Sequence, residues 1–258
     1  MSLIAPILAT LALWWLSTGI ILVLGERSDG ARRAAMAAAG VLALAGMAGV
    51  WGLRDITAPM AAYAGALSAL AIWAWHEMSF LFGYVTGPNR APCPPGLTGW
   101  PRFRAAAATL IHHELALAAT VIGLGVMSLG AANAVAFQVF ALLFVLRLSS
   151  KLNLFVAAPH FTDHFLPGRL SHLRSYFSPR PAGAFFAVTT AAMAVVAGAL
   201  FWAAASAASP FEAAAFALLA TLAALGVLEH LFLALPVPDG ALWRWLLPAR
   251  DPRRSPDL

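Results

Sequence analysis

Residues 1–27, MSLIAPILATLALWWLSTGIILVLGER, form one apolar run that ends at a charged pair. A run of this length can cross the roughly 30 Å hydrocarbon core of a bilayer as a helix. No positive region precedes it, and it is longer than the core of a cleaved signal peptide, so we expect a retained first span. The whole chain shares this character, with 258 residues, 61% of them hydrophobic, only 10% charged, and a mean hydropathy of +0.80. This composition predicts a polytopic membrane protein.

Similar apolar runs recur along the chain. A spanning segment must satisfy its own backbone hydrogen bonds, and no alternating barrel pattern appears, so the runs are expected to be helices. The predicted fold class is all-α: a polytopic integral membrane helical bundle that forms a single membrane domain over residues 1–258. About seven spans are predicted, near 3–24, 34–53, 58–86, 103–129, 132–157, 183–206 and 211–235.

The basic residues predict an orientation. Fifteen of the sixteen Lys and Arg, with Arg147 and Lys151 counted among them, fall on one side of the predicted bundle, and only Arg54 falls on the other. The positive-inside rule then places the N-terminus outside and the C-terminus in the cytoplasm. Topology explains the pI near 10.3, so no nucleic-acid partner is expected. The single Cys93 excludes an internal disulfide framework.

Two predicted cytoplasmic connections, residues 87–102 and 158–182, are too long to be simple turns. Prolines and glycines in the first forbid a helix, and Trp100 and Phe103 beside arginines suit the lipid headgroup zone. The second is expected to contain a short amphipathic surface helix. Its polar residues near the membrane face are His160, His164, Arg169 and Arg174. Each segment could be an interfacial anchor or a docking surface for a partner protein.

Ionisable residues interrupt three of the predicted spans. They are His76 and Glu77 in WAWHEMSF, His112, His113 and Glu114 in TLIHHELALAAT (109–120), and Glu229 and His230 in LGVLEHLFLALP. A charge at membrane depth costs several kcal/mol, from about 2.5 upward. At about 1.5 Å per residue, Glu77 and His113 are expected at one level, roughly 14 Å from the cytoplasmic face and near the bilayer middle. We therefore expect these groups to face a shared buried polar cavity.

One interpretation of this cluster is a di-iron or di-manganese centre, which imidazoles and carboxylates from several helices can build. Its ligands would be Glu77, His113, Glu114 and Glu229, completed by His76, His112 or His230. The Glu-x-x-His spacing that usually places two ligands on one helical face is missing.

Two other interpretations stay open. In one, the cluster is a polar network in which Arg147, Lys151 and the histidines neutralise Glu77 and Glu114. In the other, a histidine is the axial ligand to the magnesium of a bacteriochlorophyll. The candidate ligands are His76, His112 and His230. No catalytic residue is assigned by any of the three interpretations.

Long strings of the chain resemble a known family. They are WHEMSFLFGYVTGPNRAPCPPG, FRAAAATLIHHELALA, RLSSKLNLFVAAPHFTDHFLP, HLRSYF and LEHLFLALPVPDGALWRW, in order from about residue 70 to 246. This segment is similar to the photosynthetic complex assembly protein PuhE family of purple phototrophic bacteria, which is encoded among genes for reaction-centre assembly. The resemblance carries over no catalytic residues.

The resemblance implies an assembly factor for the photosynthetic reaction centre and light-harvesting complex, or for their bacteriochlorophyll supply. It also implies a multi-pass location in the bacterial cytoplasmic (inner or intracytoplasmic) membrane. The expected partners are membrane lipids, reaction-centre or light-harvesting subunits, other assembly factors, and bacteriochlorophyll. The alternative is a membrane di-metal (His/Glu) oxidoreductase that acts on a pigment precursor.

Overall fold

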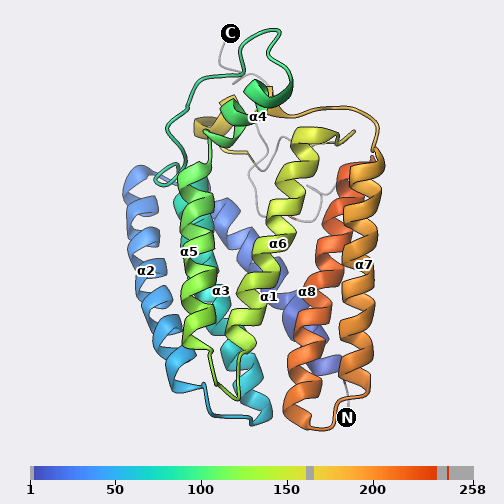
Figure 1. The fold of residues 1–258 in the computed structure, drawn as a ribbon. Coiled ribbons are helices and arrows are strands. Elements are labelled where there is room, and N and C mark those ends of the chain that lie inside the picture. Colours follow the sequence, from blue (N-terminus) through green and yellow to red (C-terminus); the bar gives the residue numbers. More distant parts are fainter. Residues whose placement is uncertain (1–2, 161–165, 237–242, 244–258) are drawn as a thin grey trace.

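A computed structural model describes residues 3–160, 166–236 and 243, and within these residues the chain is all-helical, with no strand. Figure 1 shows long helices that run up and down in one bundle. The α-helices are α1 (Ile4–Gly25), α2 (Asp29–Gly52), α3 (Pro59–Leu81), α4 (Gly99–Ala107), α5 (Ile111–Met127), α6 (Val135–Val156), α7 (Ala184–Ala205) and α8 (Pro210–Ala234), and a 3-10 helix η2 covers Gly168–Tyr176.

Five helices, α1, α2, α6, α7 and α8, are long and apolar enough to cross a membrane, and a sixth span is added if α4 and α5 together count as one. The structure thus confirms an all-helical, multi-pass membrane architecture. The 23-residue α3 does not belong to this set, since its last turns carry His76 and Glu77. The total of seven spans stays a prediction.

The helix starts follow local capping chemistry. The Ser28 hydroxyl accepts from the backbone N–H of Ala31 at the start of α2. At the start of α8, Ser209 and Glu212 form a capping box in which each side chain accepts from the backbone of the other. These bonds satisfy N–H groups that have no partner within the helix.

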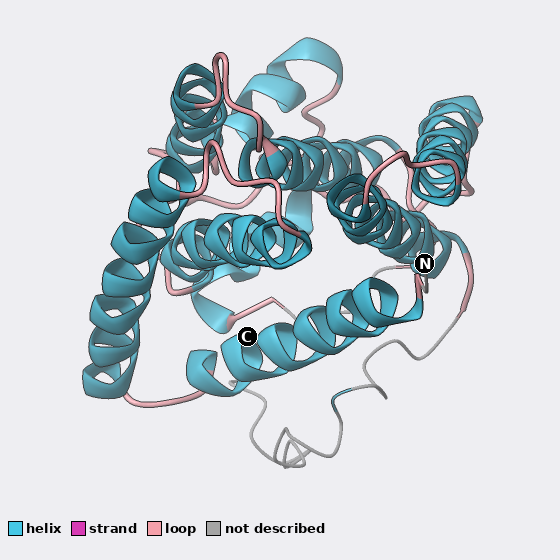
Figure 2. Cartoon of the chain, turned by 90° about the horizontal axis from the view of Figure 1, so that it is seen from below, coloured by secondary structure: helices cyan, strands magenta, loops and turns pink. Residues whose placement is uncertain are grey.

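Helix α8 is the centre of the bundle. Within its most apolar 18-residue window 67% of the residues are buried, against 11% for α1 and 17% for α2 and α7. Helices α3 and α6 pack against α8, while α1 crosses the outside of the bundle obliquely (Figures 1 and 2). The outer helices therefore offer apolar surface to a membrane.

Glycine permits a close approach between α2 and α3. A Cβ placed on Gly46 would lie 2.7 Å from the backbone oxygen of Ser68, closer than a real Cβ contact. Small residues at such positions let helix backbones pack directly, which is the common mode of helix association in membranes.

The predicted helix 103–129 is wrong in one respect, because it is broken into α4 and α5, which are bent by 70°. The loop after α3 causes the break. The Ala108 carbonyl, which would accept from a residue of α5 in a continuous helix, accepts from Asn89 N instead, at 3.0 Å. The His113 N–H donates to the Thr86 carbonyl at 3.1 Å. Two backbone groups that would form hydrogen bonds within a continuous helix thus bond to the loop instead.

Helix α3 also ends earlier than the predicted residue 86. Its last residue is Leu81, and Gly83 has a positive φ of +77° that favours glycine and turns the chain. Glu77 therefore lies four residues from the helix end, about 6 Å at the rise of an α-helix. His113 lies in the first turn of α5. Both residues lie near an end of their own helix, and their depth in a bilayer stays a prediction.

The two long connections close this end of the bundle together. The expected surface helix is the 3-10 helix η2, and its Leu170, Leu173 and Tyr176 are buried. The Tyr176 hydroxyl accepts from Asn89 Nδ2 at 2.9 Å, which joins η2 to the loop after α3. His164 of the predicted segment lies outside the described residues.

The connections after α1, α3 and α6 lie at the end of the bundle that is uppermost in Figure 1. This is the end that the basic residues assign to the cytoplasm. Arg147 and Lys151 are an exception to that count, because both lie inside α6 rather than in a connection. Which end is cytoplasmic stays a prediction.

A reporter that is active only in the periplasm tests the orientation. Fused near Asn133 or Ser209, in the short connections at the opposite end, it should be active. Fused after Gly96 or at the C-terminus it should be inactive, because these positions follow the basic residues that remain inside. The reverse pattern of activity would contradict the orientation.

Replacing Gly46 by Ala should lower the stability of the α2–α3 pair. The added Cβ meets backbone rather than a side chain that can move, so we expect a loss of about 1–3 kcal/mol, measured by thermal unfolding in detergent. Gly52→Ala is the matched control, since nothing lies within 4 Å of a Cβ there. Equal unfolding midpoints for the two variants would contradict the close contact.

Candidate functional site

A cluster of charged side chains, partly exposed at Arg147 and Glu229 and largely buried elsewhere, joins four helices at the upper end of the core. Arg147, from the middle of α6, is its centre. Its Nη1 donates to Glu229 Oε1 of α8 at 2.9 Å, and its Nη2 lies 3.5 Å from Glu77 Oε2 of α3. One guanidinium thus bridges carboxylates from two helices, which its planar fork of donors suits.

A second ion pair lies one turn further along α6. Lys151 Nζ donates to Glu114 Oε1 of α5 at 2.5 Å, with only 16% and 13% of the two side chains exposed. The ammonium also lies 5.5 Å from the centre of the Phe80 ring. Helix α6 therefore supplies both positive charges of the cluster, and α3, α5 and α8 supply one carboxylate each.

His113 is fully buried between these pairs. Its Nε2 lies 3.8 Å from Glu77 Oε1, and its ring stacks on Phe80 with 4.7 Å between ring centres. Both ring nitrogens are without a hydrogen-bond partner among the described residues, and so is Glu77 Oε1. The prediction that Glu77 and His113 lie at one level is confirmed by this contact.

Two further histidines are held by hydroxyl groups. His230 is buried, with Nδ1 2.9 Å from the Gly226 carbonyl and Nε2 3.1 Å from Ser149 Oγ. A carbonyl oxygen can only accept, so Nδ1 is the donor to Gly226, and Nε2 shares its hydrogen bond with the Ser149 hydroxyl. His76 Nε2 lies 3.0 Å from Thr120 Oγ1. The Nε2 atom of each ring therefore already has a hydrogen-bond partner within the protein.

His112 does not join the cluster. Its side chain is exposed, whereas that of His113 is buried. Adjacent residues of a helix point about 100° apart, which separates the two rings. Of the three candidate pigment ligands, His112 is the one that faces outward.

The proposed metal ligands are divided between separate partners. Glu114 contacts Lys151, Glu229 contacts Arg147, and Glu77 contacts Arg147 and His113. In the part of the chain that the structure describes, no group of three or more His, Cys, Asp or Glu side chains could hold a metal ion. This arrangement matches the charge network more closely, and the metal centre stays a prediction.

Sequence reasoning missed the polar residues of α6 that support the cluster. Asn153 is fully buried, and its Nδ2 donates to the Ser149 carbonyl and to Thr189 Oγ1, each at 3.0 Å. The string RLSSKLNLF carried the signal, because Arg147 and Lys151, and likewise Ser149 and Asn153, are four residues apart. This spacing places each pair along one side of the helix.

Replacing Lys151 by Met should destabilise the protein strongly. The variant keeps a long side chain but leaves the Glu114 carboxylate buried without a positive partner, which costs about 3–5 kcal/mol. Thermal unfolding in detergent measures the effect. Adding Glu114→Gln to the same chain should restore part of the loss, because the unpaired charge is removed. Arg104→Met, at an exposed position of α4, is the control, and an equal midpoint for wild type and Lys151→Met would contradict the buried pair.

Glu114→Gln alone separates the network from a metal centre. The amide keeps the size of the side chain but not its negative charge. If a metal binds here, iron, manganese or zinc in the purified protein should fall while the protein still inserts and accumulates. If the cluster is only a charge network, abundance and thermal stability should fall, and the wild type should contain no stoichiometric metal.

Comparison with known proteins places the chain in a family. The family model described as "Protein of unknown function (DUF3623)" matches residues 1–254. A curated protein of Rhodobacter capsulatus, described as "Uncharacterized 30.4 kDa protein in puhA 5'region", is 37% identical over 253 residues, which cover 96% of this chain and 92% of the relative. No solved structure matches. The chain therefore belongs to the DUF3623 family.

Proposed function

We propose that this protein is an integral membrane assembly factor for the bacterial photosynthetic reaction centre and light-harvesting complex, or for their bacteriochlorophyll supply. The observation that carries the proposal is the R. capsulatus relative, which is encoded upstream of puhA, in a photosynthesis gene region. Its 37% identity extends over nearly the whole chain. The strings that resemble the PuhE family lead to the same assignment. A role in the bacterial cytoplasmic membrane is part of the proposal.

The polar core supports a scaffold role over a catalytic one. Each buried carboxylate has a basic partner on another helix, so the charges hold helices together. His76 and His230 make hydrogen bonds to Thr120 and Ser149 instead of facing an open cavity. Carboxylates and histidines that bond to other helices in this way can stabilise the bundle, and this role requires no bound ligand.

The outer helices offer the surface that a membrane partner needs. Trp51 of α2 and Trp202 of α7 are 60% and 76% exposed, and apolar residues of α1 such as Ile4, Leu8 and Ile20 are exposed as well. Lipid covers such a surface when the protein is alone. Transmembrane helices of reaction-centre or light-harvesting subunits, or of other assembly factors, can replace that lipid by close packing.

Deleting the gene in a phototrophic host should lower the level of mature reaction centre or antenna, while respiratory growth continues. Absorption spectra of isolated membranes measure the complexes, and pigment extraction measures total bacteriochlorophyll. Accumulation of a pigment precursor would indicate the supply role, and complexes reduced with normal precursor levels would indicate the assembly role.

A plasmid copy of the wild-type gene should restore the complexes, which controls for effects on neighbouring genes. A copy with Arg104→Met should restore them equally, because this exposed arginine lies outside the buried cluster. Normal pigment and normal complexes in the deletion strain would contradict the proposed function.

A further inference from the structure

A cavity of about 510 Å³ lies at the basic end of the bundle, between the turn that joins α1 to α2 and the start of η2. It is lined by Gly25, Glu26, Arg32, Pro167, Gly168 and Arg169. The turn and η2 are more than 130 residues apart in sequence, so only the fold brings these arginines together.

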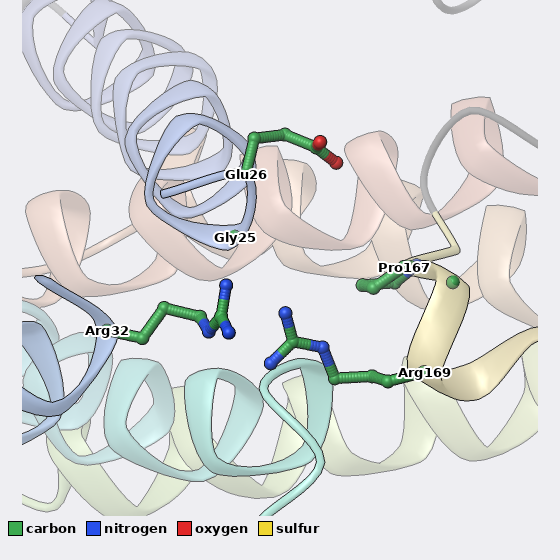
Figure 3. A pocket seen from close by; sticks show the side chains of 6 residues that line it. Gly25, Glu26, Arg32, Pro167 and Arg169 are labelled. Carbon is green, nitrogen blue, oxygen red and sulfur yellow. The ribbon is translucent and has the colours of Figure 1, made fainter. Parts of the chain in front are cut away.

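The two arginines of this cavity face one another. Figure 3 shows the guanidinium groups of Arg32 and Arg169 pointing toward each other from opposite walls, while the Glu26 carboxylate points away from both. Burial first, and the nearby charge of Arg32 second, lower the pKa of Arg169. Two like charges in this arrangement repel, and an anion between them would remove the repulsion.

Each arginine is held in place by backbone oxygens, with donors left over. Arg32 donates to the Arg27 carbonyl and to the exposed carboxylate of Asp29, and only 13% of its side chain is exposed. Its buried Nε is without a hydrogen-bond partner among the described residues. Arg169 Nη1 donates to the Phe82 carbonyl at 3.0 Å. The guanidiniums are thus positioned before any ligand arrives.

A smaller cavity of about 210 Å³ adjoins the first and shares Arg169 with it. Arg90 is part of its wall and donates to the Gly83 carbonyl at 3.4 Å. Gly83 leaves room for the Arg169 side chain, since a Cβ there would lie 3.1 Å from Arg169 Cδ. A third arginine therefore adds positive charge on the same side of the site.

We propose that the cleft between Arg32 and Arg169 binds the phosphate group of an anionic ligand, namely the headgroup of an acidic phospholipid. Guanidinium groups match the geometry of phosphate oxygens and hold them through two parallel N–H bonds. The cleft lies at the end of the helices, where lipid phosphates of a surrounding bilayer are found, and basic pockets between membrane helices are typical sites for such headgroups. This inference does not depend on the proposed function.

Binding can be measured with the purified full chain in a neutral detergent. Phosphatidylglycerol is the anionic probe, phosphatidylcholine is the zwitterionic control, and inorganic phosphate at constant ionic strength is the soluble probe. We expect phosphatidylglycerol to raise the unfolding midpoint and to remain bound in native mass spectra. Arg32→Gln and Arg169→Gln should each weaken this binding about fivefold or more, because each removes one charge from the phosphate site.

Arg104→Gln is the matched control, because it removes one exposed arginine of α4 and should bind like the wild type. If a glutamine variant does not fold, Arg169→Lys keeps the charge but not the fork, and should bind more weakly than the wild type. A response to inorganic phosphate but not to the lipid would keep the phosphate site and assign it to a soluble ligand. No response to either probe, or an equal response in Arg32→Gln, Arg169→Gln and the wild type, would overturn the proposal.

Discussion

The structure depends on the neutralisation of two positive charges inside α6. A buried ammonium or guanidinium without a partner would cost several kcal/mol even after relaxation, and a buried carboxylate would cost a similar amount. Arg147 and Lys151 avoid this cost by contacting carboxylates on α3, α5 and α8. Each carboxylate lies on a different helix. The pairing therefore requires α3, α5 and α8 to turn their carboxylates toward α6 at the height of Arg147 and Lys151. The ion pairs specify how the helices are arranged around α6, and apolar side chains pack the space between these helices.

The pairing is not balanced. Glu77, Glu114 and Glu229 carry three negative charges at full ionisation, and Arg147 and Lys151 carry two positive charges, so the described cluster has a net charge of −1 when the histidines are neutral. Glu229 is the most exposed of the three carboxylates, with 39% of its side chain exposed, compared with 10% for Glu77 and 13% for Glu114.

The apolar runs were sufficient to predict the helices but not where they break. Length and hydropathy are local, so α1, α2, α6, α7 and α8 follow from them directly. The bend between α4 and α5 depends on Asn89 and Thr86, whose backbone groups bond to Ala108 and His113 in place of the bonds that a continuous helix would make. Residues 103–129 alone do not record that competition, because Asn89 and Thr86 lie outside the run. The depth of Glu77 in a bilayer stays a prediction.

The direction of each ionisable side chain was also hidden from the sequence. In a soluble helix the polar face indicates the outside, but in a membrane both the core and the lipid are apolar, so periodicity is weak. His112 and His113 show the effect, since one is exposed and the other buried although they are neighbours. Only the positions of Lys151 and Glu77 on other helices decide which histidine turns inward.

The end of α3 connects the polar core with the arginine cleft outside it. Glu77 lies in the last turns of α3 and pairs inward with Arg147, while the carbonyl of Phe82, the first residue after that helix, accepts from Arg169. Residues 77–82 are therefore held by two guanidinium groups, that of Arg147 in the polar core and that of Arg169 at the cavity. Arg147 is matched by carboxylates, whereas Arg169 faces another arginine across a cavity. A cavity that two arginines face from opposite walls is where a bound anion would add negative charge between them.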